Sequence, residues 1–386
     1  MIWYSQQSID KNDIKSVVNV MKSKYLTQGN YVKNFERKIC HFTSAKYAVA
    51  LSNASAALHI ACITLNLKKN DTLWTVPNTF VASASCALHC GAKVSFVDID
   101  RETQNIDINK LEKKLIISKK NKTLPKVLVP VHFAGQPTPQ KEIFKLSRKY
   151  GFKIIEDASH SLGAKNGREK VGSCKWSDMT VFSFHPVKPM TSAEGGIVTT
   201  NNKNYFESLG MLRNNGITKD PKKLKIKTDW YYEQQKLGFN YRMNEIQAAL
   251  GLSQLRKLNK FNRFRNKVAN KYYKKLATLP LNLPKIRKNF YSTYHLFCIT
   301  LDLKKIKLPY NLIFSKLRKK GVGVVLHYLP VHLHPIFKKL GFKKGQYPVA
   351  ERHAKTALSL PMFYGMTNSQ IEYVVRTLKK VLFNKK

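Results

Sequence analysis

Short apolar runs alternate with amphipathic stretches over the first half of the chain. The runs are apolar throughout and rich in β-branched residues, which predicts strands buried on both faces of a sheet. We expect strands at Tyr47–Leu51, Thr72–Val76, Lys93–Val97, Lys126–His132, Lys153–Glu156, Thr180–Ser183 and Gly196–Thr200. The intervening stretches predict helices at Ala54–Leu67, Val81–Cys90, Asn109–Ile117 and Gln140–Tyr150. This alternation indicates an α/β fold, in which helices cover both faces of a mostly parallel, mixed sheet.

The pattern changes near residue 245. A long helical stretch, Asn244–Lys275, precedes a Pro-rich region, and the last predicted elements are strands near Tyr294–Leu301 and Gly323–Leu326 and a helix after Thr367. Near the start, a helix is expected around residues 10–23. We therefore predict a large domain over residues 1–245, including the N-terminal segment, and a smaller α+β domain over residues 246–386. The Lys-rich run Lys219–Thr228 is expected to form a mobile loop.

Polar and aromatic side chains follow most of the predicted strands, at the point where each strand ends. In open α/β sheets, ligands bind beyond the carboxyl ends of the strands. One polar strand end would mean little, but several at the same edge predict a binding site there. The segments are Asn53–Ser55, Pro77–Phe80, Asp98, His132–Gly135, Asp157–His160 and Phe184–Lys188.

Asn53-Ala54-Ser55 opens a predicted helix with small residues. The free backbone N–H groups and the positive end of the helix dipole suit a phosphate group. An ordinary Asn or Ser helix cap explains the same residues more simply. Taken alone, the segment therefore leaves the phosphate site open.

Asp157 and Lys188 are the two charged side chains that the pattern singles out. Asp157 ends an apolar strand, where a carboxylate needs a cationic partner or several hydrogen bonds, unless it only caps the next turn. Lys188 follows another apolar strand and lies between Pro186 and Pro189, just before Glu194-Gly195-Gly196. A lysine in so lysine-rich a chain is normally a solvated surface group, but this stiffened, glycine-flanked setting favours a ligand role.

The net charge of the chain is +45, from 68 Lys and Arg against 23 Asp and Glu. Such a charge raises the possibility of a nucleic-acid partner. Lys greatly outnumbers Arg, however, and is spread over nearly every segment, whereas nucleic-acid surfaces prefer Arg interleaved with aromatics. Only Phe261–Arg265 has that mixture, and an ordinary helix with an apolar stripe explains it. We therefore favour a lysine-rich enzyme surface, which would attract anionic substrates.

The six cysteines contain no CxxC pair and no zinc-like spacing, so no metal site is expected. Cys86 and Cys90, four residues apart in a helical pattern, are predicted to be buried thiols. The first residues lack the basic and apolar regions of a signal peptide. Two charge-free runs, residues 47–67 and 72–92, contain Ser, Thr, Asn and His, so buried strand–helix units explain them better than membrane spans. These features predict a soluble, cytoplasmic protein.

Several motifs together resemble the sugar aminotransferases of the DegT/DnrJ/EryC1/StrS type. These are fold-type I enzymes that aminate keto-sugars on nucleotide carriers. The resemblance runs in order over nearly the whole chain, through Leu26–Gly29, Phe35-Glu36, Asn53–His59, Pro77–Phe80, Glu156–His160, Phe182–Pro189, Glu194–Gly196 and Gly238–Arg242. Within the family, the pseudaminic acid pathway members are the most similar, through Tyr4–Gln6, Asp157–His160, His185–Pro189 and His327–Leu333.

The resemblance implies pyridoxal 5'-phosphate (PLP) as cofactor. Lys188 would carry PLP covalently and move protons, Asp157 would pair with its ring nitrogen, Phe80 would stack on the ring, and His160 would lie beside the ring hydroxyl. The phosphate would be held by Ala54, Ser55, Ser183 and, from a second subunit, Asn240. That last contact implies a homodimer with shared active sites, although an ordinary helix cap would also explain Asn240.

The resemblance further implies transfer of the amino group of L-glutamate to the 4-keto carbon of a UDP-linked 2-acetamido-2,6-dideoxy-hexos-4-ulose. Substrate contacts would come from Tyr4, Gln28, His185 and His327. Two family features differ in this chain: Asn215 replaces the His of an Arg-x-His-Gly motif, and Asn30 replaces a Pro that many relatives have. A substrate role for that His is therefore absent here.

Three alternatives remain open. The chain could be a nucleotide-sugar aminotransferase with a different sugar or position. It could be a sugar dehydratase, although relatives of that kind replace the lysine with His, which Lys188 argues against. From a different class, it could be a basic nucleic-acid-binding regulator with a relict enzyme core. The favoured interpretation excludes nucleic acid and membrane as partners.

Overall fold

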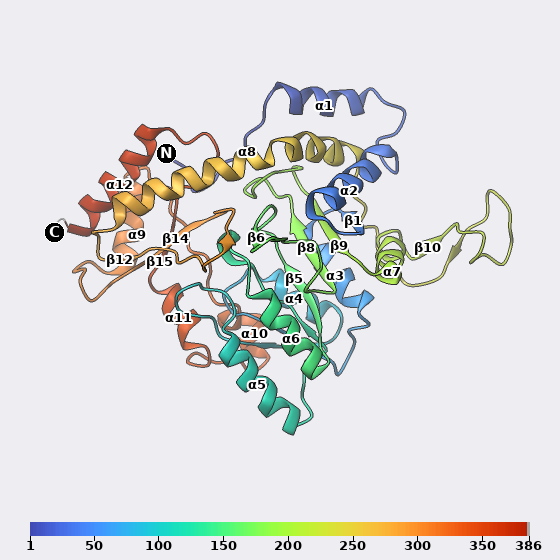
Figure 1. Cartoon of the computed structure of the whole chain (residues 1–386), viewed down its shortest axis with the longest axis horizontal. Helices are drawn as coiled ribbons and strands as arrows, with labels where there is room; N and C mark the ends of the chain where they lie inside the picture. Colours follow the sequence, from blue (N-terminus) through green and yellow to red (C-terminus); the bar gives the residue numbers. More distant parts are fainter. Residues whose placement is uncertain (384–386) are drawn as a thin grey trace.

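A seven-stranded sheet forms the centre of the larger part of the molecule. The computed structural model describes residues 1–383 (Figure 1). The strand order is β1-β9-β8-β5-β4-β2-β3, in which β1 and β8 pair with β9 antiparallel and the other neighbours pair parallel. The strands are β1 (Tyr47–Leu51), β2 (Thr72–Thr75), β3 (Lys93–Phe96), β4 (Val127–Leu128), β5 (Lys153–Asp157), β8 (Met179–Ser183) and β9 (Gly196–Thr200).

Helices cover both faces of this sheet, because its strands are apolar on both sides. One face packs against α3 (Ala54–Thr64), α4 (Ala82–His89) and α7 (Lys203–Arg213). The other face packs against α2 (Asn30–Thr43), α5 (Ile108–Lys120), α6 (Gln140–Tyr150) and the first half of α8 (Glu245–Leu276). The mostly parallel, mixed α/β sheet predicted from the sequence is therefore confirmed.

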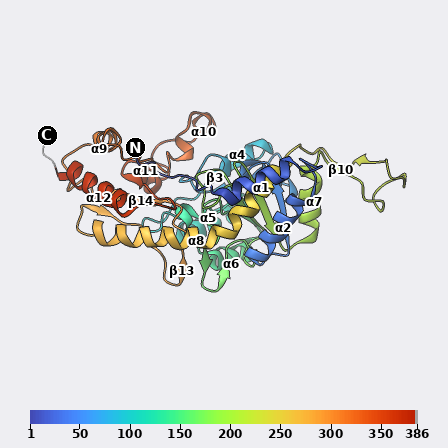
Figure 2. The same cartoon turned by 90° about the horizontal axis from the view of Figure 1, so that it is seen from above.

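Helix α8 runs from the large sheet to a second core (Figures 1 and 2). It begins with a capping box between Asn244 and Gln247, and its first half packs against α1 (Lys11–Met21) and α2. Its second half buries Val268, Tyr272 and Leu276 in the second core. That core also contains β12 (Leu281–Asn282), β14 (Phe297–Leu301), β15 (Ala357–Leu360), α9 (Tyr310–Lys319) and α12 (Asn368–Phe383).

Two chain segments connect the two cores besides α8. The N-terminal residues join the second core, since Ile2 pairs with Val322 and the N–H of Met362 donates to the carbonyl of Tyr4. In the other direction, α10 (Pro335–Lys339) places Phe337 in the core of the large sheet, and α11 (Pro348–Ala354) follows. The division into two domains at residue 245 stays a prediction.

Two predicted strands differ in the structure from what the pattern indicated. The run Lys126–His132 forms a ladder only at β4, because Pro130 has no N–H to donate. The run Gly323–Leu326 is not a strand, because the N–H of Gly323 donates to the carbonyl of Ile2 while Val325 makes a single bridge to Ser359.

A hairpin projects away from the large sheet (Figures 1 and 2). It is built on β10 (Ile217–Thr218) and β11 (Glu233–Gln234), and the run Lys219–Thr228 lies between them. Mobility of this run stays a prediction. The remaining strands, β6 (Lys165–Asn166), β7 (Glu169–Lys170) and β13 (Phe290–Tyr291), form a small separate sheet. Within residues 1–383, no helix combines the length and the apolar character that a membrane span requires.

The buried carboxylate of Glu245 joins the start of α8 to the start of α2. It accepts hydrogen bonds from the backbone N–H of Gly29 at 3.0 Å and of Tyr31 at 2.6 Å. A negative charge at the first turn of a helix is also favoured by the helix dipole. The N–H of Glu245 in turn donates to the carbonyl of Leu26. These contacts fix the turn that carries Gln28.

We expect Glu245→Ala to lower the free energy of unfolding by about 1.5–3 kcal/mol, because two partly buried N–H groups lose a charged acceptor. Denaturant unfolding of the purified protein measures this. The control is Glu372→Ala, which removes an exposed ion pair with Lys275 and should cost less than about 1 kcal/mol. Equal effects of the two substitutions would show that the Glu245 contacts do not stabilise the fold.

Candidate active site

The carboxyl ends of the parallel strands bring several of the predicted residues to one edge of the sheet. Asp157 is the last residue of β5, and Ser183 is the last residue of the adjacent β8. The segment Pro77–Phe80 follows β2, two strands away. Lys188 lies on the loop between β8 and β9. The site is therefore built at the edge where the polar strand ends predicted it.

Lys188 has an amine that loses its proton more readily than an ordinary lysine. Its pKa is lowered to about 8, because burial strips water from the ammonium, while the charge of Asp157 acts in the opposite direction. The loop is held on both sides: the N–H of Lys188 donates to His185, and the Ser5 hydroxyl donates to the carbonyl of Val187 at 3.0 Å. A lysine of this kind serves both as nucleophile and as proton carrier.

Asp157 is buried and accepts three hydrogen bonds through its carboxylate. One oxygen, Oδ2, accepts from the Ser83 hydroxyl at 2.6 Å. The other, Oδ1, accepts from the N–H of Ser159 at 3.1 Å and from its hydroxyl at 2.6 Å. The carboxylate thus caps the following turn and also receives a donor from α4. These bonds hold a negative charge in a buried position facing the site of Lys188.

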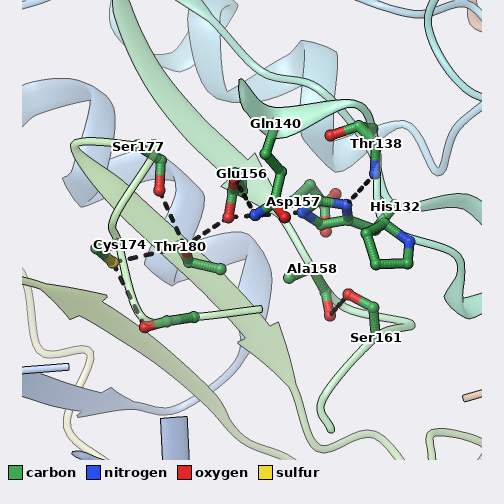
Figure 3. A network of polar contacts seen from close by, with 12 residues as sticks. His132, Thr138, Gln140, Glu156, Asp157, Ala158, Ser161, Cys174, Ser177 and Thr180 are labelled. Carbon is green, nitrogen blue, oxygen red and sulfur yellow. Dashed lines mark hydrogen bonds and ion pairs between the residues drawn. The ribbon is translucent and has the colours of Figure 1, made fainter. Parts of the chain in front are cut away.

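A polar network fixes the strand that carries Asp157 (Figure 3). Glu156, the preceding residue, accepts from Gln140 Nε2 at 2.6 Å and from Thr180 Oγ1 at 2.8 Å. His132 Nε2 lies 3.6 Å from Glu156, and its Nδ1 accepts from the N–H of Thr138. Although burial opposes it, His132 and these hydrogen bonds keep the pKa of Glu156 below its ordinary value. The network ties β5 to β8 and to the start of α6.

His160 lies in a buried group of aromatic residues beside Asp157. Its Nε2 is 3.2 Å from the Tyr328 hydroxyl, and its ring centroid is 4.3 Å from that of His295. Burial, together with the positive charge of Lys188, keeps the pKa of His160 well below its ordinary value. The imidazole is therefore neutral at physiological pH and adds no positive charge near the amine.

The start of α3 has the features of a phosphate site. Asn53 caps the helix and accepts from the N–H of Ala56 at 2.8 Å. The N–H groups of Ala54 and Ser55 have no hydrogen-bond acceptor among residues 1–383. A Cβ at Gly196 would lie 2.5 Å from the nitrogen of Ala54, so β9 approaches this helix end closely. Free amides at the positive end of an eleven-residue helix fit a phosphate group.

Ser183 and Phe80 border the same region. Ser183 pairs with Gly196 across β8 and β9, which places it near the start of α3, and its hydroxyl accepts weakly from His185 at 3.4 Å. Phe80 precedes α4 and is 58% exposed. Its ring is therefore free to pack against a flat ligand.

The structure does not gather all predicted residues around Lys188. Asn240 is exposed and pairs with Asn214, and α8 is capped by Asn244, so the alternative of a helix cap at Asn240 is wrong. Gln28 is exposed on the turn before α2, and His185 is exposed beside Lys188. Asp98, which follows β3, instead accepts hydrogen bonds from Val349 and Ala350 at the start of α11.

His327 and Tyr4 lie together on the side of the second core. Their ring centroids are 5.6 Å apart, and His327 Nδ1 is 2.8 Å from the Ser359 hydroxyl. Burial, together with the charge of Lys188, lowers the pKa of His327 to about 3. His327 is therefore a neutral group whose exposed surface is small.

Four residues that contact the candidate site were not predicted from the sequence: Asn78, Ser83, His295 and Tyr328. Asn78 accepts from the N–H of Tyr328 and links the segment after β2 to the segment before α10. Asn78 and Tyr328 lie inside motifs that the sequence analysis had singled out, so a signal existed for both. Ser83 and His295 carried no signal, because each lies within an apolar pattern. Within residues 1–383, no group of three His, Cys, Asp or Glu side chains is arranged to hold a metal ion.

Comparison with known proteins finds similarity over nearly the whole chain. A model of the DegT/DnrJ/EryC1/StrS aminotransferase family matches residues 7–379. The UDP-4-amino-4,6-dideoxy-N-acetyl-beta-L-altrosamine transaminase of Campylobacter jejuni is 38% identical over 384 residues, which cover 99% of this chain and 98% of that protein.

Solved structures give the same result. Helicobacter pylori PseC, an aminotransferase involved in the biosynthesis of pseudoaminic acid, aligns with a TM-score of 0.90 and 30% identity over 99% of both chains. Spr1654 from Streptococcus pneumoniae, solved in its PLP form, aligns with a TM-score of 0.87 and 26% identity, covering 98% of this chain and 97% of that one.

The lowered pKa of Lys188 predicts an unusual pH dependence of its reactivity. In protein prepared without cofactor, acylation of Lys188 by limiting acetic anhydride should reach half its maximum rate near pH 8. Peptide mapping by mass spectrometry measures this. Lys153 is an internal control, since its hydrogen bond to Asp178 raises its pKa. Asp157→Asn should move the Lys188 midpoint to still lower pH, because the charge that favours the ammonium is removed. Identical profiles for Lys188 and Lys153 would contradict the assignment.

Proposed function

The chain belongs to the DegT/DnrJ/EryC1/StrS aminotransferase family, and on that premise we propose that it transfers the amino group of L-glutamate to the 4-keto carbon of a UDP-linked 2-acetamido-2,6-dideoxy-hexos-4-ulose. The family resemblance, the enzyme class and the fold-type I architecture predicted from the sequence are confirmed. The chain is a sugar aminotransferase, and its cofactor is PLP, as in Spr1654, which is solved in PLP and PMP forms. The identity of the sugar and of the amino donor belongs to the proposal.

One observation carries the proposal. A lysine of lowered pKa lies with a buried, triply hydrogen-bonded carboxylate at the ligand-binding edge of the sheet. This arrangement occurs in a chain 38% identical, over almost its full length, to a transaminase whose name gives a UDP-linked 4-amino-4,6-dideoxy sugar. The pseudaminic acid type of amino-sugar synthesis is proposed on that similarity.

The described residues fit PLP. The phosphate would accept hydrogen bonds from the free N–H groups of Ala54 and Ser55 and from the Ser183 hydroxyl. Asp157 would accept a hydrogen bond from the protonated ring nitrogen, and its three donors hold the carboxylate in place. Phe80 would pack on the ring, and neutral His160 would lie beside the ring hydroxyl. When bound, PLP supplies an electron-accepting ring that stabilises negative charge on the reacting carbon.

Lys188 would hold the cofactor and then carry the proton. With a pKa of about 8, its amine exchanges a proton at neutral pH with little free-energy cost in either direction. The hydrogen bond from the Ser5 hydroxyl to the carbonyl of Val187 holds the loop that carries Lys188. His160 and His327 are neutral, so they add no positive charge beside the Lys188 amine. Burial is the cause of the lowered pKa of Lys188.

The proposed substrate contacts surround the same edge. His185 is exposed directly before the proline-framed lysine, and Tyr4 lies against His327. Gln28 would reach the substrate from the turn that Glu245 fixes. The net charge of +45 favours both a nucleotide diphosphate and glutamate, since each is an anion.

A homodimer with shared sites is part of the proposal. Asn240 lies exposed at the base of the projecting hairpin, where it is free to contact the cofactor phosphate of a second copy. The hairpin itself exposes four large apolar side chains, Ile226, Trp230, Tyr232 and Leu237. Helix α1 exposes a second apolar stripe, Ile14, Val18 and Met21. Extended apolar surfaces of this kind are typical of interfaces between subunits.

The remaining alternatives differ in what they leave unexplained. Another keto-sugar or another position of amination would use the same residues and is separated only by assay. A nucleic-acid-binding regulator with a relict core would have no use for a preserved Lys188 and Asp157. Absence of nucleic-acid and membrane partners, and the cytoplasmic location expected from the sequence, are part of the same proposal.

The substrate assignment is tested by assay with PLP, L-glutamate and a panel of nucleotide keto-sugars. We expect 2-oxoglutarate and a 4-amino sugar only from UDP-linked 4-keto substrates, as measured by mass spectrometry. Lys188→Ala should lose at least about 10²–10⁴-fold in rate, the usual contribution of a general acid/base, while Lys175→Ala stays normal. Turnover of a 3-keto sugar, or of a sugar on a different nucleotide, in place of these substrates would overturn the assignment.

The shared site is tested by mixing two variants. Asn240→Ala should weaken PLP retention by about 1.5–3 kcal/mol, the value of a hydrogen bond to a charged group. At limiting PLP, mixed dimers of Lys188→Ala and Asn240→Ala subunits contain one intact site and one doubly altered site. Activity above the sum of the separate samples is therefore expected. With mixed dimers demonstrated by native mass spectrometry, purely additive activity would show that Asn240 serves its own subunit.

A further inference from the structure

One ring nitrogen of His160 is buried without a partner. His160 lies on the turn after β5 and is 5% exposed. Its Nε2 lies 3.2 Å from the Tyr328 hydroxyl, whereas its Nδ1 has no hydrogen-bond partner among residues 1–383. A buried polar atom of this kind costs free energy unless a ligand or a water molecule pairs with it. The unpaired nitrogen therefore marks the edge of the imidazole at which a ligand is expected.

Contacts on the backbone and on the ring hold His160 in place. Its carbonyl accepts a hydrogen bond from the Thr293 hydroxyl at 2.7 Å. The hydrogen bonds from Ser159 to the Asp157 carboxylate fix the turn on which His160 lies. The His295 ring packs against the imidazole at a centroid distance of 4.3 Å. The orientation of Nδ1 is therefore set by the protein itself.

Tyr328 is fixed by a second contact, at its backbone. Its N–H donates to Oδ1 of buried Asn78 at 3.0 Å. Within residues 1–383, His160 is the hydrogen-bond partner of its hydroxyl, and no other is found. Burial, followed by the charge of Asp157, raises the pKa of the phenol, so it keeps its proton at physiological pH. The hydroxyl therefore has one proton to donate and one acceptor within reach.

The count of donors and acceptors decides which nitrogen of His160 carries the proton. A neutral imidazole has one N–H, and its other nitrogen is an acceptor. With the proton on Nε2, the Tyr328 proton would have no acceptor and Nδ1 would have no donor. With the proton on Nδ1, the Tyr328 hydroxyl donates to Nε2, and only the Nδ1–H remains unpaired. The second arrangement leaves fewer polar groups unsatisfied, and the group that it leaves free is a donor.

We propose that Tyr328 is a positioning residue that fixes the Nδ1–H tautomer of His160, so that His160 donates a hydrogen bond to the ring oxygen of PLP. The inference rests on the proposed placement of His160 beside the ring hydroxyl. On the pyridine ring, one carbon separates the nitrogen from the carbon that bears the hydroxyl. One short turn carrying Asp157 and His160 would therefore supply a partner for each of the two groups.

The imidazoles around this hydrogen bond do not become charged at neutral pH. The titratable groups near His160 are Lys188, His132, His295 and His327. Burial lowers the pKa of His160, His295 and His327 below the ordinary value of histidine. A titration measured at neutral pH and above therefore does not report on the charging of these three imidazoles.

The first experiment titrates the visible absorption band of the holoenzyme, which arises from PLP joined to Lys188. A donor at the ring oxygen stabilises negative charge there and favours loss of the chromophore's proton. Tyr328→Phe should therefore move the midpoint to higher pH by about 0.5–1 unit, the equivalent of one hydrogen bond between neutral groups. His160→Leu should move it by about 1–2 units, because a bond to a charged oxygen is lost. The control Tyr272→Phe, which removes a buried hydroxyl in the second core, should leave the midpoint unchanged.

A double variant separates the proposal from the placement on which it rests. In the His160→Leu background, Tyr328→Phe should cause no further shift, because its effect passes through the imidazole. Equal shifts in both backgrounds, or a shift with His160→Leu and none with Tyr328→Phe, would overturn the proposal and leave the placement of His160 intact. No shift with either substitution would overturn both. The titration uses no amino donor and no sugar, so its result is independent of the substrate assignment.

The second experiment reads the tautomer directly, by nitrogen-15 NMR of holoenzyme labelled at its histidine rings. The His160 signals are identified by their loss in His160→Leu. We expect the proton on Nδ1 in the unmodified holoenzyme, and in part of the population on Nε2 in Tyr328→Phe. A proton on Nε2 in the unmodified protein, or identical spectra for the two proteins, would overturn the proposal. Circular dichroism confirms that each variant is folded.

Discussion

The proposed active site depends on a negative charge kept buried at the end of β5. A carboxylate in that position costs several kcal/mol unless its oxygens are hydrogen-bonded, and Asp157 is stabilised there by Ser83 and Ser159. The same charge partly offsets the effect of burial on Lys188. The charge of Asp157 therefore helps to set the protonation of Lys188, so both groups must be held in place.

The surrounding structure is organised around holding this pair. Glu156, the residue before Asp157, is also a buried carboxylate. Its contacts with Gln140, Thr180 and His132 hold strand β5 in place (Figure 3). Helix α4 supplies Ser83, while α3 begins with two free amides close to Gly196. Each contact joins segments far apart in the sequence. The position of Asp157 therefore depends on contacts from several elements at this edge of the sheet.

Several features of this site were predictable from the sequence. Asp157, Ser183 and Lys188 follow apolar runs, and the carboxyl ends of parallel strands meet at one edge of a sheet, so their proximity follows from the pattern. The cap at Asn53 followed from residue type. Other features were not predictable. His295 and Ser83 contact the site from apolar segments, and Asp98 faces α11, because long-range packing decides which strand ends remain open.

Local chemistry and tertiary packing thus decided different properties of this protein. Hydrophobic periodicity and the polar strand ends determined the α/β fold, the edge that carries the site and the candidate pair Asp157 and Lys188, since these depend on neighbours in the sequence. Burial decided the rest. In the unfolded chain the amine of Lys188 has the pKa of any lysine. Its pKa falls to about 8 only when folding buries it and removes its water. Only the folded chain decides such a value, because an electrostatic environment is a sum over groups that the chain brings together from distant positions.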